Sequence, residues 1–440
     1  MNLTLLVENN PKIESFYKLN LSTWLGLETL TQKNGEAAVQ YLSTQSAKIN
    51  LIIVRYNIGK EQTAAIISAF VKKKALNIPI IVIGPGEVPD VLCVVNSLDL
   101  KLMIKTAAVA LNITAKEMSS KTVPDFFPIP LIYFNSIKRS VCPIYAQNVD
   151  DPQKYHLQID KLMEFDEEML FNLTQEKVMF LYVDKMDRLN FVSNVTAELI
   201  SELKVDDLSE DENISAVDMS MELLSKKLLR LGINEETVNL AKKNIAAIAL
   251  TAKKSNNLSK LLGRLLNNKA SYLYKHTQIL TYVCFHIIHN IDWGSPEQEE
   301  KISFIAFFHD IALENDVQCQ IHTTVQLKNS LLTKEDKELV EKHAQIAAEY
   351  ITKFPHAPMG ADQIIRQHHG QLHGLGFSDH YGANISPMAM VFIVAEEFTR
   401  IIMDQKNENI NRDSIIDKLK KEFTSNRFLK IIEKLESITL

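Results

Sequence analysis

The stretch Lys301–Ala312, KISFIAFFHDIA, decides how the C-terminal half of this chain can fold. Apolar residues and His309 recur in it at spacings of three and four, the period of a helix with one inward face. A helix would therefore carry His309 into an apolar interior, with Asp310 beside it. An ionisable pair is costly to bury unless its charge is compensated, and a bound metal is the usual compensation. One His-Asp pair occurs by chance in many proteins, so the prediction of a metal site depends on whether other helices supply further ligands.

Four more helical segments in residues 261–440 place histidine or carboxylate side chains on their apolar faces. Taken singly, each of these side chains is more often a satisfied core residue than a ligand. Taken jointly, they are too costly to bury without compensation. Mixed imidazole and carboxylate ligands predict a site for two divalent metal ions, and they suit Fe, Mn or Zn. The predicted ligands are His276, His309, Asp310, His343, His368, His369 and Glu396.

Composition sets the wider limits. The chain has 440 residues, 46% hydrophobic and 23% charged, with a net charge of −6, which is typical of a globular protein of two or three domains. This mild acidity gives no support for nucleic-acid binding. No apolar run approaches the roughly 18 residues of a membrane span. Four scattered cysteines and an N-terminus without a signal-peptide pattern predict a cytoplasmic protein.

Short β-branched runs alternate with helical segments in the N-terminal region, which predicts an α/β domain with a parallel sheet. The order resembles the response-regulator receiver domain, in which acidic residues bind Mg²⁺ and an Asp after the third strand accepts phosphate. Here Arg55 stands at the acceptor position, and Arg can neither accept a phosphoryl group nor ligate Mg²⁺. We predict a degenerate pseudo-receiver that serves docking or dimerisation; an unrelated α/β domain is the alternative.

A small α+β connector is predicted next, followed by an all-α bundle. The connector begins at Val123–Pro130, where prolines break the helical pattern. We expect a strand at Leu131–Asn135 and a helix at Gln158–Glu168, and we interpret the acidic stretch Val205–Glu212 as a solvated loop. The predicted domains are 1–120, 121–212 and 213–440.

The order of the predicted ligands resembles the HD-GYP branch of the HD phosphohydrolases, which are bacterial phosphodiesterases that hydrolyse cyclic di-GMP. The resemblance covers roughly residues 270–400. It includes LKNSLLTKED (Leu327–Asp336) before His343, similar to the family's K-P-G-x-L-T-x-x-E segment, and Leu375-Gly376-Phe377 at the place of the GYP loop. It implies a helical HD-GYP-like bundle in which Asp310 bridges two metals, and a cyclic dinucleotide such as cyclic di-GMP as ligand.

Several positions depart from the family pattern. Leu313 replaces the lysine of H-D-x-G-K, Phe377 replaces the tyrosine of the GYP loop, and Met390 replaces an arginine. The last ligand is Glu396 in place of Asp, which can still coordinate. Three-metal members carry a Glu at the position of Tyr272, so we expect two metals.

The departures leave two hypotheses open. The first is a divergent phosphodiesterase for cyclic di-GMP or a related dinucleotide; the second is a catalytically impaired domain that works as a nucleotide sensor or protein-interaction scaffold. The sequence is compatible with a homodimer and with a signalling partner protein. His322 lies in loop-like sequence, and we interpret it as incidental. His373 is interpreted as an acid or a new ligand, with a solvent-facing loop histidine as the alternative. The remaining site predictions are Asp310 and His373 as catalytic residues and Lys328, Arg366 and Phe377 as substrate-binding residues.

Overall fold

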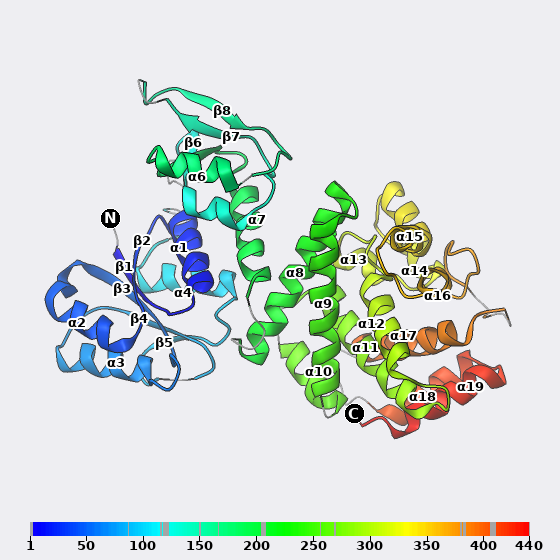
Figure 1. The fold of residues 1–440 in the computed structure, drawn as a ribbon. Helices are drawn as coiled ribbons and strands as arrows, with labels where there is room; N and C mark the ends of the chain where they lie inside the picture. The colour runs from blue at the N-terminus through cyan, green and yellow to red at the C-terminus, as the bar shows by residue number, and fades with distance from the viewer. Residues whose placement is uncertain are drawn as a thin grey trace. The chain divides into compact units, whose positions relative to one another are not determined.

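The structure is a computed structural model that describes residues 3–86, 88–114, 117, 123–148, 151–165, 167–203, 208–255, 257–267, 270–378, 381, 384–404 and 411–439. The chain forms two compact units, Met1–Met219 and Ser220–Leu440 (Figure 1). Both predicted N-terminal domains fall within the first unit; the predicted limit at 120 lies outside the described residues, and the three-domain division stays a prediction. Within the described ranges, no helix is both long and apolar enough to span a membrane.

The first unit begins with a five-stranded parallel sheet in the order β2-β1-β3-β4-β5. Its central strands are apolar throughout because helices cover both faces. In β1, Leu6 packs with α1 and α4, whereas Leu5 and Val7 pack with α2 and α3 on the opposite face. The predicted receiver-like α/β fold is confirmed. The elements are β1 Leu3–Val7, α1 Pro11–Leu25, β2 Glu28–Gln32, α2 Gly35–Gln45, β3 Ile49–Arg55, α3 Thr63–Lys73, β4 Ile80–Ile83, β5 Leu92–Val94 and α4 Leu100–Ala110.

The predicted α+β connector is present as a four-stranded sheet with helices, but most of its elements differ from those expected from the sequence. Its antiparallel order is β6-β9-β7-β8, formed by Phe126–Pro130, Phe180–Asp184, Ile144–Gln147 and Tyr155–Ile159. The prolines of β6 are tolerated because β6 is an edge strand. The predictions for Leu131–Asn135 and Gln158–Glu168 were wrong. The first is a 3₁₀ helix, Leu131–Ser136, and the second starts in β8, which pairs with β7, and ends at the start of helix α6, Glu167–Gln175.

The second unit is helical, as predicted. Helix α17 is apolar on nearly all sides and buried along most of its length, which places it at the centre of the core. Helix α11 packs against it. The helices are α8 Glu210–Leu231, which starts in the first unit, α9 Glu235–Lys254, α10 Leu258–Asn267, α11 Tyr272–Asn290, α12 Pro296–Phe308, α13 Asp316–Cys319, α14 Thr324–Asn329, α15 Lys334–Thr352, α16 Ala361–Gln367, α17 Pro387–Asp404, α18 Arg412–Glu422 and α19 Asn426–Ile432.

Arg55, at the end of β3, forms a buried ion cluster where a receiver domain would accept phosphate. Its Nε donates to Glu8 Oε2 at 2.7 Å, and its Nη1 donates to Glu212 Oε1 at 3.3 Å. Glu212 also accepts hydrogen bonds from the backbone and hydroxyl of Ser209 and from the hydroxyl of Ser97. Burial would raise the pKa of Glu212, but the charge of Arg55 and these hydrogen bonds hold it below its usual value.

The interpretation of Val205–Glu212 as a solvated loop was therefore wrong at its end. Glu212 lies in α8 and is 1% exposed. Its partner Arg55 is 157 residues away in the sequence, so no local pattern could predict the pairing. Residues 205–207 of the stretch lie outside the described residues.

Arg55→Met should lower the free energy of unfolding by about 3 kcal/mol, because it leaves two buried carboxylates unpaired. Arg139→Met is the matched control, since Arg139 and Glu164 form an exposed pair whose loss should cost at most about 1 kcal/mol. Urea unfolding of the full chain measures both. A carboxyl with a lowered pKa contributes its stability above the unfolded pKa, here about 4.5, and loses it as pH falls. The Arg55→Met deficit should therefore shrink below about pH 4.5, and equal effects of the two variants would contradict this account.

Candidate metal centre

The structure brings the seven predicted ligands together at one place in the second unit. They come from five helices or the residues directly after them, and each is between 0% and 9% exposed. Burying ionisable side chains away from water is costly, so the burial of this set calls for a compensating charge. The ligands are His276 of α11, His309 and Asp310 at the end of α12, His343 of α15, His368 and His369 at the end of α16, and Glu396 of α17.

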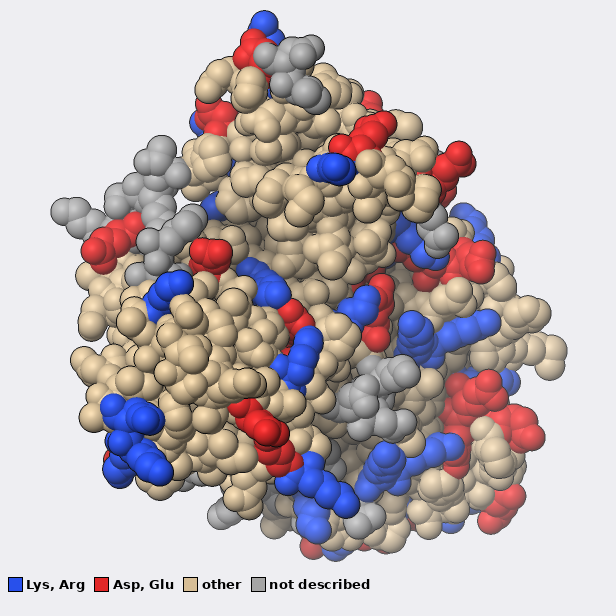
Figure 2. All heavy atoms as spheres, turned by 60° about the vertical axis from the view of Figure 1, so that its left-hand side comes forward, with Lys and Arg blue, Asp and Glu red and all other residues tan. Residues whose placement is uncertain are grey.

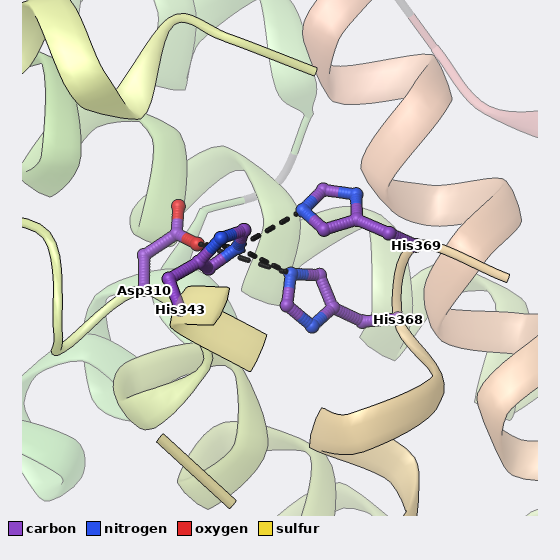
Figure 3. A group of neighbouring side chains, drawn as sticks. All are labelled: Asp310, His343, His368 and His369. Atoms are coloured by element: carbon purple, nitrogen blue, oxygen red, sulfur yellow. Dashed lines mark hydrogen bonds and ion pairs between the residues drawn. The ribbon is translucent and has the colours of Figure 1, made fainter. Parts of the chain in front are cut away.

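Four side chains, Asp310, His343, His368 and His369, converge on one point and are called the His343 cluster here (Figure 3). The Nε2 atom of His343 lies 3.2 Å from that of His368 and 3.0 Å from that of His369. Asp310 Oδ1 lies 3.4 Å from His343 Nε2 and 3.9 Å from His368 Nε2. These one-per-residue donor atoms all lie within 4.8 Å of one another, a spacing that suits a shared metal ion.

A second group, His276, His309 and Asp310, is called the His276 cluster here. His309 Nε2 lies 3.2 Å from Asp310 Oδ2, so the two oxygens of Asp310 face different histidine groups. Glu396 adjoins this cluster, with Oε1 3.1 Å from His276 Nε2 and Oε2 3.7 Å from His309 Nε2. Asp310 is thereby placed between the two clusters, as a bridging carboxylate must be.

Backbone carbonyls three residues earlier fix three of the rings. The Nδ1 atoms of His309, His343 and His368 donate to the carbonyls of Ala306, Val340 and Ile365 at 2.9, 2.6 and 2.6 Å. His309 and His368 stand at the C-termini of α12 and α16. A ring that donates from Nδ1 presents the Nε2 lone pair to the cluster.

This arrangement supplies the test of whether a metal fits. His343 and His368 both use Nδ1–H on the backbone, so their Nε2 lone pairs face each other at 3.2 Å. Two facing lone pairs repel unless a cation lies between them. The donor chemistry and the geometry therefore fit a divalent metal.

The carboxylates dominate the electrostatics of the site. Burial would lower the pKa of His309, but Asp310 and Glu396 raise it to about 9. Burial would raise the pKa of Glu396, but His276 and His309 lower it to about 2. Burial and the neighbouring His343 together lower the pKa of His368 to about 3. The carboxylates are therefore ionised and attract a positive charge, which a metal ion would supply in place of the His309 proton.

His322, interpreted from the sequence as incidental, lies at the site. Its side chain is 7% exposed, and its Nδ1 lies 3.8 Å from Glu396 Oε1. Its Nε2 lies 3.2 Å from the hydroxyl of Tyr272. His322 belongs to the connection between α13 and α14, where no helical period could indicate an inward side chain. Only the path of that connection over the site brings it there.

Two of the residues that depart from the pattern of the resembled family, Leu313 and Phe377, lie in one apolar cluster beside the ligands. Leu313 and Phe377 are 5% and 8% exposed and pack with Cys319, Ile321 and Val340. The Phe377 ring lies 4.6 Å from that of His369, centroid to centroid, at 63°. Phe377 therefore lies beside the ligands, where the prediction of a substrate-binding role requires it.

The remaining predicted residues are not part of this group. Lys328 and His373 are exposed, and Arg366 is half-buried two residues before His368. Among the described residues, no hydrogen bond or ion pair joins these three side chains to the ligands, so their predicted roles stay predictions.

No family model matches the chain, and no curated protein matches it. Among solved structures, the chain is similar to Bd1817, described as a HDG"Y"P protein from Bdellovibrio bacteriovorus, with 16% sequence identity and a TM-score of 0.38. The match covers 71% of this chain and 98% of that chain. A likeness of this degree assigns no activity, and the geometry of the site is what supports the function proposed below.

Asp310→Ala should remove metal from both positions, because Asp310 belongs to both clusters, whereas His369→Ala should affect only one. The loss of affinity should exceed the roughly 10–100-fold that removal of an outer-shell partner costs. Elemental analysis after equilibrium dialysis gives the metal content per chain. The control is His289→Ala, an exposed histidine that pairs with Glu299. Equal metal content in the Asp310→Ala and His369→Ala proteins would contradict a bridging Asp310.

Proposed function

We propose that the second unit is a metal-dependent phosphodiesterase that acts on cyclic di-GMP or a related cyclic dinucleotide. The observation that carries the proposal is the shared carboxylate: the two oxygens of Asp310 face the histidines of two adjacent clusters. In this proposal His343, His368 and His369 hold one divalent metal, Fe, Mn or Zn. The other is held by His276, His309 and Glu396. A pair of metals so placed supplies Lewis acidity and an activated water for in-line attack on phosphorus.

The chain's own residues prepare the site for this chemistry. The carbonyls of Ala306, Val340 and Ile365 orient three imidazoles before any ligand binds. Such preorganisation avoids a reorganisation cost during the reaction. Leu313 and Phe377 exclude water on one side, which strengthens electrostatic interactions within the site.

Substrate recognition is assigned to the His369 side. His369 is 9% exposed, the largest value among the seven predicted ligands, and Phe377 lies against it. In the proposal Phe377 contacts the dinucleotide, and Arg366 and Lys328 approach its phosphates. His373, four residues after His369, is the proposed acid for the leaving oxygen.

A nucleotide sensor or scaffold is the second candidate, and one observation favours it. Leu313 is buried in the apolar cluster where the resembled family carries a lysine. Loss of one electrostatic contact to the transition state can cost about 10²–10³ in rate. A domain that binds a dinucleotide without turning it over is compatible with that substitution.

The first unit is proposed to dock a signalling partner or a second copy of the chain in the cytoplasm. Arg55 occupies the acceptor position and is engaged by Glu8 and Glu212, so phosphorylation there is chemically ruled out. Figure 2 shows acidic and basic side chains interspersed on the face drawn, with neither sign covering it alone. Such a face suits a protein partner better than a nucleic acid.

Full-length protein, purified anaerobically and loaded with Fe²⁺ or Mn²⁺, should hydrolyse cyclic di-GMP faster than the Asp310→Ala protein. Chromatographic separation of the nucleotides measures the product. No turnover with about two metals bound per chain would overturn the phosphodiesterase proposal for this substrate and favour the sensor.

Leu313→Lys should raise the rate of cyclic di-GMP hydrolysis by roughly 10–100-fold, because it returns a cation to the site. Leu331→Lys is the matched control, since Leu331 is fully exposed and lies outside the apolar cluster. Circular dichroism checks that both variants fold. An equal rate in the two variants would show that a lysine at this position does not limit the reaction.

A further inference from the structure

We propose that His322 is an additional ligand at the metal position of the His276 cluster, and that the Tyr272 hydroxyl orients it. This position then carries more protein ligands than that of the His343 cluster, and substrate and water are handled at the latter. The inference deepens the proposed function and rests on it for the reaction. The coordination by His322 is judged separately.

The placement of His322 is that of a ligand. Its side chain is nearly buried, with Nδ1 3.8 Å from Glu396 Oε1. This separation is too long for a hydrogen bond. It suits two atoms that coordinate one ion, since ligand atoms each about 2.1 Å from a metal lie about 3–4 Å apart. Glu396 Oε1 is buried, and its 3.1 Å contact with His276 Nε2 does not have the geometry of a hydrogen bond.

Tyr272 gives His322 the outer-shell partner that metal-bound imidazoles have. The Tyr272 hydroxyl lies 3.2 Å from His322 Nε2, and the Tyr272 ring stacks on His276 at 5.8 Å and 11°. When Nε2–H donates to this hydroxyl, the Nδ1 lone pair faces Glu396. His309 follows the same rule with its nitrogens exchanged, because its Nδ1 donates to a carbonyl and its Nε2 faces the cluster.

The two metal positions differ in consequence. With His322, the position of the His276 cluster has three imidazoles and two carboxylates. The position of the His343 cluster has three imidazoles and one carboxylate. Closed sites are typical of structural metals, and open sites of catalytic ones. The His343 cluster also contains His369, 9% exposed. The open position, and with it the substrate phosphate, therefore belongs to the His343 cluster. Three imidazoles at the other position favour a first-row transition ion over Mg²⁺ or Ca²⁺.

A His322→Cys variant of the full chain, loaded with Co²⁺, tests the coordination directly. If position 322 ligates, a new sulfur-to-cobalt charge-transfer absorption should appear. The wild-type protein sets the background, because Cys319 is buried in the neighbouring apolar cluster. His289→Cys is the matched control at an exposed histidine of the same unit. A folded, cobalt-loaded His322→Cys protein without the band would overturn the proposal.

Tyr272→Phe provides a second test that does not change His322 itself. It keeps the aromatic ring on His276 and removes only the hydroxyl. Metal affinity at one of the two positions should fall about 10-fold or more, as for other outer-shell partners. Tyr282→Phe, on the same helix α11, is the control. Equal affinities in the two variants, measured by equilibrium dialysis, would overturn the orienting role of Tyr272 and the proposal with it.

Failure of this inference and failure of the proposed function can be told apart. A cobalt band without hydrolysis would keep His322 as a ligand and reject the phosphodiesterase. Hydrolysis by the wild-type protein, with no band in the folded His322→Cys variant, would keep the phosphodiesterase and reject His322 as a ligand. A wild-type protein that binds no metal would overturn both.

Discussion

The arrangement of the second unit depends on the sharing of one carboxylate, Asp310, by two groups of histidines. Its Oδ1 faces His343 and its Oδ2 faces His309, so both clusters require the end of α12 at one position. Burying this many ionisable groups is favourable only with a compensating cation. The core around α17 therefore stabilises the fold and also positions the ligand side chains.

Two of the ligand rings are oriented by backbone carbonyls at helix ends. His309 and His368 stand where α12 and α16 terminate, and their rings donate to the carbonyls of Ala306 and Ile365, three residues earlier in the chain. These contacts set which ring nitrogen faces the cluster. A loop histidine, His322, reaches the site by a different route and takes its orientation from Tyr272.

Both units replace a charged functional position with an internal contact. Leu313 and Phe377 form apolar packing beside the ligands of the second unit, at positions where the resembled family carries a lysine and a tyrosine. Arg55 in the first unit stands at an acceptor position and is held by Glu8 and Glu212. In each case the fold keeps the surrounding framework while the chemistry of the central residue changes.

The sequence by itself determined that the N-terminal region is an α/β domain with a parallel sheet, that the second unit is helical, and which residues are candidate ligands. These follow from periodicity, which a helix or strand expresses locally whatever its neighbours. The tertiary structure alone decided the sharing of Asp310, the pairing of Arg55 with Glu212 and the position of His322, since each joins segments far apart in the chain. It also decided that Gln158 and Ile159 belong to strand β8, in which Ile159 pairs with Ile144, because the sheet partner overrides the local helical pattern. Contacts between distant segments carry no local period, and for that reason they could not be predicted from the sequence.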